Sequence, residues 1–229
     1  MIIDQINGEK RRGLSKRLIE LGLLKSTISD SGGYFKDVPR KILTLTPKGL
    51  EILSHAVPLS YGYDFNKGVN QAELRHHHIA QKVTLNFFLG KDDNLKYFST
   101  ELDRLGKSII GMKEPDVVLF FDESMPNELD VGVERLRKIA AEVELTGKYG
   151  LKFDRFKESI LTAIEPDGTY GEVFIYFDSM HQLDRYKRAL SPGNEVNVWE
   201  KNSRGYWEVE EVIVVPDYAK HAIQFILLG

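Results

Sequence analysis

The segment Lys138–Lys148, KIAAEVELTGK, decides the fold of the larger part of this chain together with the segment Glu114–Phe121, EPDVVLFF. Small and apolar residues surround Glu142 and Glu144, which are two positions apart. Alternate residues of a strand point to the same face, so a strand here places both carboxylates on one face. Carboxylates that share a half-buried face repel each other unless a cation or a base compensates. We therefore expect a positive charge beside this strand.

A third carboxylate, Asp116, follows Pro115 at the start of the other segment. If the two segments are neighbouring strands, Asp116 completes an oxygen site for Mg²⁺ or Mn²⁺ that leaves positions for water and a phosphate. The chain has no cysteine, which excludes disulfides, thiolate zinc sites and cysteine nucleophiles. The sequence thus points to a hard cation.

The pattern around these two strands predicts a fold of the α/β (α+β) class. Three consecutive strands followed by a crossover helix and a further strand make a mixed sheet flanked by helices. The tail, residues 209–228, is expected to add a strand and a last short helix. The other predicted elements are helices at residues 71–89, 149–164 and 181–190 and strands at residues 95–102, 115–121, 138–145, 171–179 and 195–200.

The first part of the chain shows a different pattern. Residues 11–24, RRGLSKRLIELGLL, have leucines at helical spacing, with Gly22 close to the predicted end. A polar, glycine-bearing turn leads to a short strand at Lys41–Leu45, after which Thr46 can cap a helix that begins at Pro47. Helix, β-wing, strand and capped helix is the order of a winged helix-turn-helix. The alternative is a helix-hairpin-helix packing module that makes no DNA contact.

A stretch rich in glycine, proline and tyrosine without any period, VPLSYGYDFNKG, separates the two patterns. We therefore predict a partial winged-helix DNA-binding domain at residues 1–56, a linker at residues 57–70 and a catalytic domain at residues 71–229.

Composition and charge distribution set limits on the class of protein. No apolar run is long enough for a membrane span and the first residues lack the apolar core of a signal peptide, so a cytoplasmic location is expected. The formal net charge is −3, but basic residues cluster in the first part of the chain and acidic residues between Glu114 and Glu144. The residues expected to contact DNA are Arg11, Arg12, Lys16, Arg17 and Lys41.

Two strings resemble known families. "RLIELGLLK … ILTLTPKGLEIL" resembles the latter part of bacterial winged-helix DNA-binding domains, whose first helices would here be absent or nearly so. The second resemblance is to the PD-(D/E)XK nuclease superfamily. It rests on Pro115-Asp116, on the acid Glu142 in the next strand, and on the residue two positions after that acid. It implies a restriction-endonuclease-like sheet. This resemblance implies that Asp116 and Glu142 hold the metal. Glu144 stands where the family usually has lysine, and Lys148 or Lys152 could supply that cation instead.

The whole pattern resembles, more narrowly, the replication-relaxation proteins and MOB-C-type plasmid relaxases. That resemblance implies a metal-dependent endonuclease that nicks one DNA strand at a plasmid transfer origin, together with accessory mobilisation proteins. Our mechanism hypothesis assigns catalytic roles to four residues: Asp116 and Glu142 hold the ion, Glu144 orients or deprotonates water, and Lys148 steadies charge. His76 or His77 and Glu101 are additional candidates.

Other interpretations stay open at this point. A Glu-x-Glu pair on an edge strand is usually a solvated face, and a histidine on a helix is more often part of the core than a ligand. Tyr34, Tyr61 and Tyr63 could stack on bases or form a phosphotyrosine, but loop packing is commoner. For the whole protein, the alternatives are a non-catalytic DNA-binding replication or transfer regulator and a restriction or repair nuclease.

Overall fold

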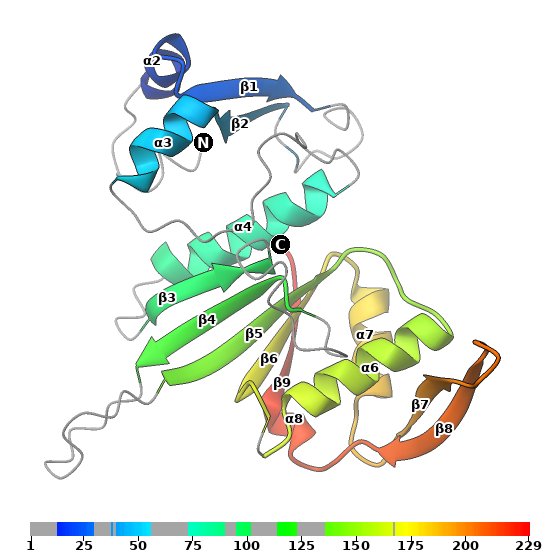
Figure 1. Cartoon of the computed structure of the whole chain (residues 1–229). Coiled ribbons are helices and arrows are strands. Elements are labelled where there is room, and N and C mark those ends of the chain that lie inside the picture. Colours follow the sequence, from blue (N-terminus) through cyan, green and yellow to red (C-terminus); the bar gives the residue numbers. More distant parts are fainter. Residues whose placement is uncertain are drawn as a thin grey trace, which may run out of the picture. The chain divides into compact units, whose positions relative to one another are not determined.

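The computed structural model describes residues 13–29, 38, 40–55, 73–89, 95–101, 114–122, 136–166 and 168–229. The chain divides into two compact units, Met1–Lys91 and Asp92–Gly229, and each unit is described by itself (Figure 1). The linker predicted at residues 57–70 lies outside the described residues. In this division the helix predicted at residues 71–89 belongs to the first unit.

The first unit contains a two-stranded antiparallel sheet and three described helices. Thr46 caps the helix after the second strand, as predicted: its hydroxyl oxygen accepts from Gly49 N–H (3.1 Å) and its hydroxyl donates to the Gly22 carbonyl (2.6 Å). The predicted helix over residues 11–24 is shorter in the structure. It ends at Glu20, and Leu24 already belongs to a strand. The elements are α2 (Leu14–Glu20), β1 (Leu24–Ile28), β2 (Lys41–Leu45), α3 (Pro47–Ser54) and α4 (Leu74–Leu89).

Gly49 explains how closely α3 approaches the segment before β1. A Cβ atom at Gly49 would lie 2.1 Å from the carbonyl oxygen of Leu23, a distance that no side chain can tolerate. Since Leu23 O also accepts the Thr46 N–H at 3.0 Å, the start of α3 and the loop after α2 are joined through backbone groups. Glycine at this position is therefore required by packing.

The second unit contains a five-stranded mixed sheet, which confirms the predicted class. The strand order is β3-β4-β5-β6-β9, antiparallel from β3 to β5 and parallel from β5 to β9. The strands β7 and β8 form a separate hairpin. The elements are β3 (Leu95–Thr100), β4 (Val117–Asp122), β5 (Leu136–Glu144), α6 (Leu151–Ala163), β6 (Glu172–Phe177), α7 (Met180–Ala189), β7 (Glu195–Lys201), β8 (Trp207–Val214), α8 (Ala219–Ala222) and β9 (Ile223–Leu227).

The end of the chain corrects one prediction. The tail was expected to finish in a short helix, but the helix α8 covers only Ala219–Ala222, and Ile223–Leu227 forms the strand β9 beside β6. The segment IQFIL is rich in β-branched and aromatic residues, which suit a strand. Its partner strand lies far away in the sequence, so the local pattern did not reveal the pairing.

The main core of the second unit lies between the sheet and the helices α6 and α7. Ala140 of β5 contributes to this core, which shows that the even-numbered face of β5 looks toward these helices. Tyr186 of α7 is completely buried, and its ring contacts three phenylalanine rings at centroid distances of 4.7–5.5 Å. The aromatic and aliphatic residues at the centre are Phe156, Ile160, Val173, Ile175, Phe177 and Tyr186.

Asp154 joins the helix α6 to the hairpin. Its carboxylate accepts hydrogen bonds from Asn197 Nδ2 (3.2 Å) and Trp199 Nε1 (3.0 Å), and it pairs with Lys157 Nζ (2.9 Å). Burial raises the pKa of Asp154, but these bonds to the charged form outweigh burial, so the pKa lies below its ordinary value. One carboxylate therefore anchors β7 to α6.

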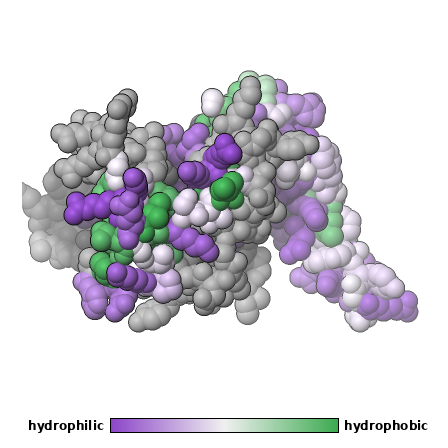
Figure 2. Space-filling view, turned by 90° about the horizontal axis from the view of Figure 1, so that it is seen from above, coloured by the Kyte–Doolittle hydropathy of each residue, from purple (hydrophilic) through white to green (hydrophobic). Residues whose placement is uncertain are grey.

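Large apolar side chains are exposed in both units, with Tyr149 at 70%, Tyr206 at 69% and Ile28 at 61%. Figure 2 shows one face of the described residues, on which apolar side chains (green) adjoin charged ones (purple). Within the described ranges, no helix is long and apolar enough to cross a membrane.

We predict that Asp154→Ala lowers the free energy of unfolding by about 2 kcal/mol, because Trp199 Nε1 and Lys157 lose a partly buried partner. Urea unfolding measures the effect, with Asp184→Ala, an exposed position of α7, as the control. Because the folded pKa of Asp154 is depressed, its stabilisation is present above the unfolded pKa and is lost as the pH falls through the folded value. The difference between the wild type and Asp154→Ala should therefore shrink below about pH 4. An undiminished difference in acid would contradict this account.

Candidate active site

Three acidic residues lie side by side at one end of the antiparallel strands: Glu101 directly after β3, Asp116 directly before β4, and Glu142 within β5. The register pairs Thr100 with Val117 and Val117 with Ala141. When this register is continued by one residue, Glu101 stands opposite Asp116, and Asp116 stands opposite Glu142. A backbone hydrogen bond supports the first of these pairs: the Glu101 N–H donates to the Asp116 carbonyl oxygen at 2.9 Å. Residues directly opposite each other share a face of the sheet. The prediction that the two segments are neighbouring strands is therefore confirmed.

Asp116 is fastened to the neighbouring strand by its side chain. Its Oδ2 accepts the N–H of Val143 at 2.6 Å, and the residue is only 6% exposed. Glu142, opposite it, is 2% exposed. The interpretation that Glu142 and Glu144 form a solvated edge-strand face is wrong, because β5 lies between β4 and β6 and both side chains are buried.

The buried carboxylate of Glu144 meets the positive charge that the sequence analysis expected. Its Oε1 forms an ion pair with Lys148 Nζ, and its Oε2 accepts from the hydroxyl of Tyr186 at 3.3 Å. Glu144 is 3% exposed, so this charge needs both partners to offset its loss of hydration. Of the two candidate lysines, Lys148 makes this pair, whereas Lys152 is exposed on α6.

Helix α7 holds the loop that carries Lys148. The Lys148 N–H donates to the Tyr186 hydroxyl oxygen at 3.0 Å, and Nη2 of Arg185 donates to the Lys148 carbonyl. The Gln182 amide, oriented to satisfy both groups, donates to the Glu144 carbonyl (3.3 Å) and accepts from Gly147 N–H (3.1 Å). The backbone of this loop is therefore fixed by three residues of one helix, Gln182, Arg185 and Tyr186.

Sequence reasoning missed these three residues of α7. Gln182, Arg185 and Tyr186 stand at helical spacing on one face, which is the only local sign of their common direction. Nothing in the sequence indicates that this face meets the loop after β5, because that contact joins residues 35 (182 − 147) or more positions apart.

The other predicted residues belong to the first unit, which is described by itself. His76 and His77 lie on α4, where His77 Nε2 is 3.4 Å from Glu73 Oε2. Their roles stay predictions. Lys16 and Arg17 are exposed on α2, as is Lys41 at the start of β2. Arg11, Arg12, Tyr34, Tyr61 and Tyr63 lie outside the described residues.

The acidic side chains Asp116 and Glu142 provide some, but not all, of the ligands that a hard cation needs. In the described ranges, no group of three histidine, aspartate or glutamate side chains could hold one metal ion. Mg²⁺, however, is commonly held by one or two carboxylates plus water and substrate phosphate. Asp116, directly before β4, and Glu142 of the neighbouring strand β5 are two buried carboxylates, so their chemistry and position fit that smaller donor set.

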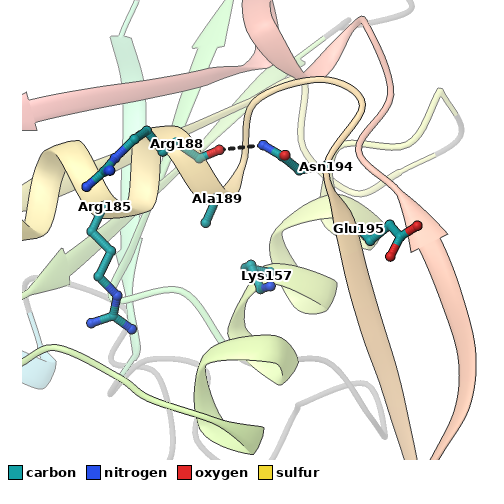
Figure 3. Close-up of a pocket in the computed structure, with 6 residues that line it drawn as sticks. All are labelled: Lys157, Arg185, Arg188, Ala189, Asn194 and Glu195. Carbon is teal, nitrogen blue, oxygen red and sulfur yellow. Dashed lines mark hydrogen bonds between the residues drawn. The ribbon is translucent and has the colours of Figure 1, made fainter.

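A shallow pocket of about 440 Å³ lies beside this region, between α6, α7 and the start of β7. It does not include the carboxylates of Asp116 and Glu142. Figure 3 shows the Arg185 guanidinium directed away from Asn194 and Glu195, and the Asn194 amide bonded to the Arg188 carbonyl at 2.6 Å. Lys157, also in the lining, is already paired with Asp154. The lining residues are Lys157, Arg185, Arg188, Ala189, Asn194 and Glu195.

No family model, no curated protein and no solved structure matches this chain.

We predict that Tyr186→Phe lowers the free energy of unfolding by about 1–2 kcal/mol, because the hydroxyl is lost while the ring packing is kept. Hydrogen exchange should also accelerate at the Lys148 amide, which loses its acceptor. Tyr176→Phe is the matched control: burial raises the pKa of Tyr176 to about 12, and its hydroxyl makes no hydrogen bond to another described residue. Equal effects of the two substitutions, by urea unfolding and exchange, would contradict the assigned role of Tyr186.

Proposed function

We propose that this protein is a metal-dependent DNA-nicking endonuclease of the relaxase type, acting at a plasmid transfer origin. The observation that carries the proposal is the pair of buried carboxylates Asp116, directly before β4, and Glu142 of β5, which stand opposite each other when the β4–β5 register is continued by one residue. Carboxylate oxygens are the ligands that Mg²⁺ and Mn²⁺ take in proteins, and one or two of them together with water and substrate phosphate are enough to hold such an ion. The resemblance of Pro115-Asp116 and the following acidic strand to PD-(D/E)XK nucleases supports the same reading.

Asp116 and Glu142 would hold Mg²⁺ or Mn²⁺, and Glu101, whose backbone N–H bonds the Asp116 carbonyl, is a further candidate that would act through water. When bound, the ion would neutralise charge on the attacked phosphate and favour ionisation of a water molecule. The Val143 N–H keeps the Asp116 carboxylate in one orientation. These residues thus bind and orient, and a restriction-endonuclease-like sheet supplies their spacing.

Lys148 would supply the cation that the family usually carries two positions after the second acid. An ammonium group has three hydrogens to donate, so its pair with Glu144 does not exhaust its capacity toward a phosphate oxygen. Glu144 would then orient Lys148 and a water molecule. A donor fixed before the substrate arrives stabilises developing charge without a cost of reorganisation.

The first unit would bind duplex DNA. The order α2, β1, β2 and capped α3 and the exposed cations Lys16, Arg17 and Lys41 support a partial winged helix. Positive charge on such a unit attracts the phosphate backbone irrespective of sequence. Accessory mobilisation proteins would complete recognition of the origin.

A non-catalytic DNA-binding regulator is the second candidate. The observation that favours it is the ion pair of Lys148 with Glu144 at the place of the family's lysine, because a neutralised cation stabilises a transition state less than an uncompensated one. A restriction or repair nuclease is the third candidate. It differs in its product, a double-strand break.

We predict that the wild-type protein converts supercoiled plasmid that carries a transfer origin to nicked circles with Mn²⁺, and that chelation with EDTA abolishes the activity. Glu142→Gln and Asp116→Asn should slow nicking by about 10²–10³-fold, since each removes one negative charge from the metal ligands. Asn keeps an acceptor for Val143 N–H, which protects the fold. Glu165→Gln, at an exposed position, is the control.

Gel analysis of the plasmid separates the three candidates. Linear product would favour a restriction or repair nuclease, and unchanged plasmid with intact DNA binding would favour the regulator. Full nicking by purified Glu142→Gln would contradict the proposed site.

We also predict that Lys148→Met slows nicking by about 10²-fold, as expected when one fixed electrostatic donor is removed. The exchange Glu144→Lys with Lys148→Glu keeps the ion pair and moves the cation to the strand position that the family uses, so it should recover part of the rate. Thermal unfolding of both proteins controls for the buried charge. If the double variant folds but nicks DNA no faster than Lys148→Met, the proposed electrostatic role of the Lys148 cation is contradicted.

A further inference from the structure

Tyr149 is an exposed aromatic ring in the loop that carries Lys148. It is 70% exposed, yet the loop residues around it are fixed by α7. The guanidinium carbon of Arg185 lies 4.1 Å from the ring centroid. The same guanidinium donates to the Lys148 carbonyl, so the cation beneath the ring is itself held in place.

The ring also lies close against the backbone at Gly147. A Cβ atom at Gly147 would be 3.4 Å from both Cε2 and the hydroxyl oxygen of Tyr149, and 3.3 Å from Nη1 of Arg185. A side chain at position 147 would press on both groups. The loop thus presents a ring that is supported by a cation and a glycine, while most of the tyrosine stays open to solvent.

The charge around this ring suits a polyanion. From Lys148 to Lys157 the sequence KYGLKFDRFK contains four cations and one acid, Asp154. That acid is engaged with Lys157 and the hairpin, whereas Lys152 and Arg155 are exposed in the first half of α6. The Arg155 guanidinium carbon lies 4.7 Å from the ring centroid of Trp207 in the hairpin, so Lys152 is the cation of α6 nearer to Tyr149 in the sequence. An exposed ring interleaved with exposed cations is the combination that binds nucleic-acid strands, through base stacking and phosphate attraction.

We propose that Tyr149 is a stacking platform for an unpaired base of single-stranded DNA, next to the phosphate that Lys148 contacts. The inference rests on the proposed function. The preferred substrate is then single-stranded DNA at the nick site. Bases within a duplex already stack on their neighbours, so an unpaired base is the one whose face can reach the ring. Support by Arg185 lowers the entropic cost of ordering the ring on binding.

Tyr206 provides a control of nearly the same exposure, 69%, outside the loop that carries Lys148. It lies in the turn of the β7–β8 hairpin, which carries Lys201 and Arg204 as well as Glu208. Because this turn also has basic residues, Tyr206→Ala tests whether any exposed tyrosine near cations contributes to single-strand binding. The proposal assigns the stack to Tyr149, which Arg185 and the loop hold in place, so no loss of binding is expected for Tyr206→Ala.

Fluorescence anisotropy of a labelled oligonucleotide tests the proposal on the full chain, in EDTA so that no cleavage occurs. The single strand and the blunt duplex of the same sequence are compared for the wild type, Tyr149→Ala, Tyr149→Phe and Tyr206→Ala. We expect Tyr149→Ala to weaken single-strand binding about tenfold, within the range for loss of one base–aromatic stack. Duplex binding should not change. Tyr149→Phe and Tyr206→Ala should bind both DNAs like the wild type.

The proposal is overturned if Tyr149→Ala binds the single strand as tightly as the wild type, if it loses single strand and duplex equally, or if the wild type does not bind the single strand. Parallel plasmid assays with Mn²⁺ keep the two proposals apart. Nicking without any effect of Tyr149→Ala on binding refutes the platform alone. A selective loss of single-strand binding without nicking by the wild type supports the platform and refutes the nuclease.

Discussion

The side-chain interactions of Glu144 link three elements of the second unit. A carboxylate that is almost completely buried at the end of β5 requires compensation for its lost hydration. Lys148 provides charge from the following loop and Tyr186 provides a hydroxyl from α7. Because the same hydroxyl accepts the Lys148 N–H, the strand, the loop and the helix are connected through one phenol oxygen. The position of the cation is therefore a consequence of satisfying a buried negative charge.

The positions of Asp116 and Glu142 depend on backbone pairing in the same way. Asp116 lies opposite Glu142 because β4 and β5 pair in one register, and the Asp116 side chain bonds the backbone of β5 directly. A slip of one residue would turn Glu142 away from the face that α6 and α7 cover. Apolar residues in both strands, from Val117 onward in β4 and at Ile139–Ala141 in β5, fix the register by their burial. Core packing and site geometry are thus two results of one alignment.

Local pattern predicted most of the elements in the second unit and only part of its site. The alternation at Lys138–Leu145 indicated β5 and the common face of Glu142 and Glu144, because that periodicity is a property of the strand itself. The partnership of Lys148 with Glu144 was one of two options, since Lys152 also follows the strand. Tyr186 could not be predicted, because its role arises where α7 meets a distant loop. The strand β9 was missed for the same reason: parallel pairing leaves no nearby signal in the sequence.

The pairing of β9 with β6 bears on the order in which the molecule assembles. Val173 pairs with Ile223, 50 residues later (223 − 173), whereas β4 and β5 are consecutive along the chain. Closing such a long loop costs conformational entropy before its contacts form, and non-local pairing slows folding. The pair of Asp116 and Glu142 can therefore form in an early hairpin, while the core that holds Tyr186 is completed only when the last strand docks. The pairing of Asp116 with Glu142 would then form earlier in folding than the packing of Tyr186, which holds the loop of Lys148.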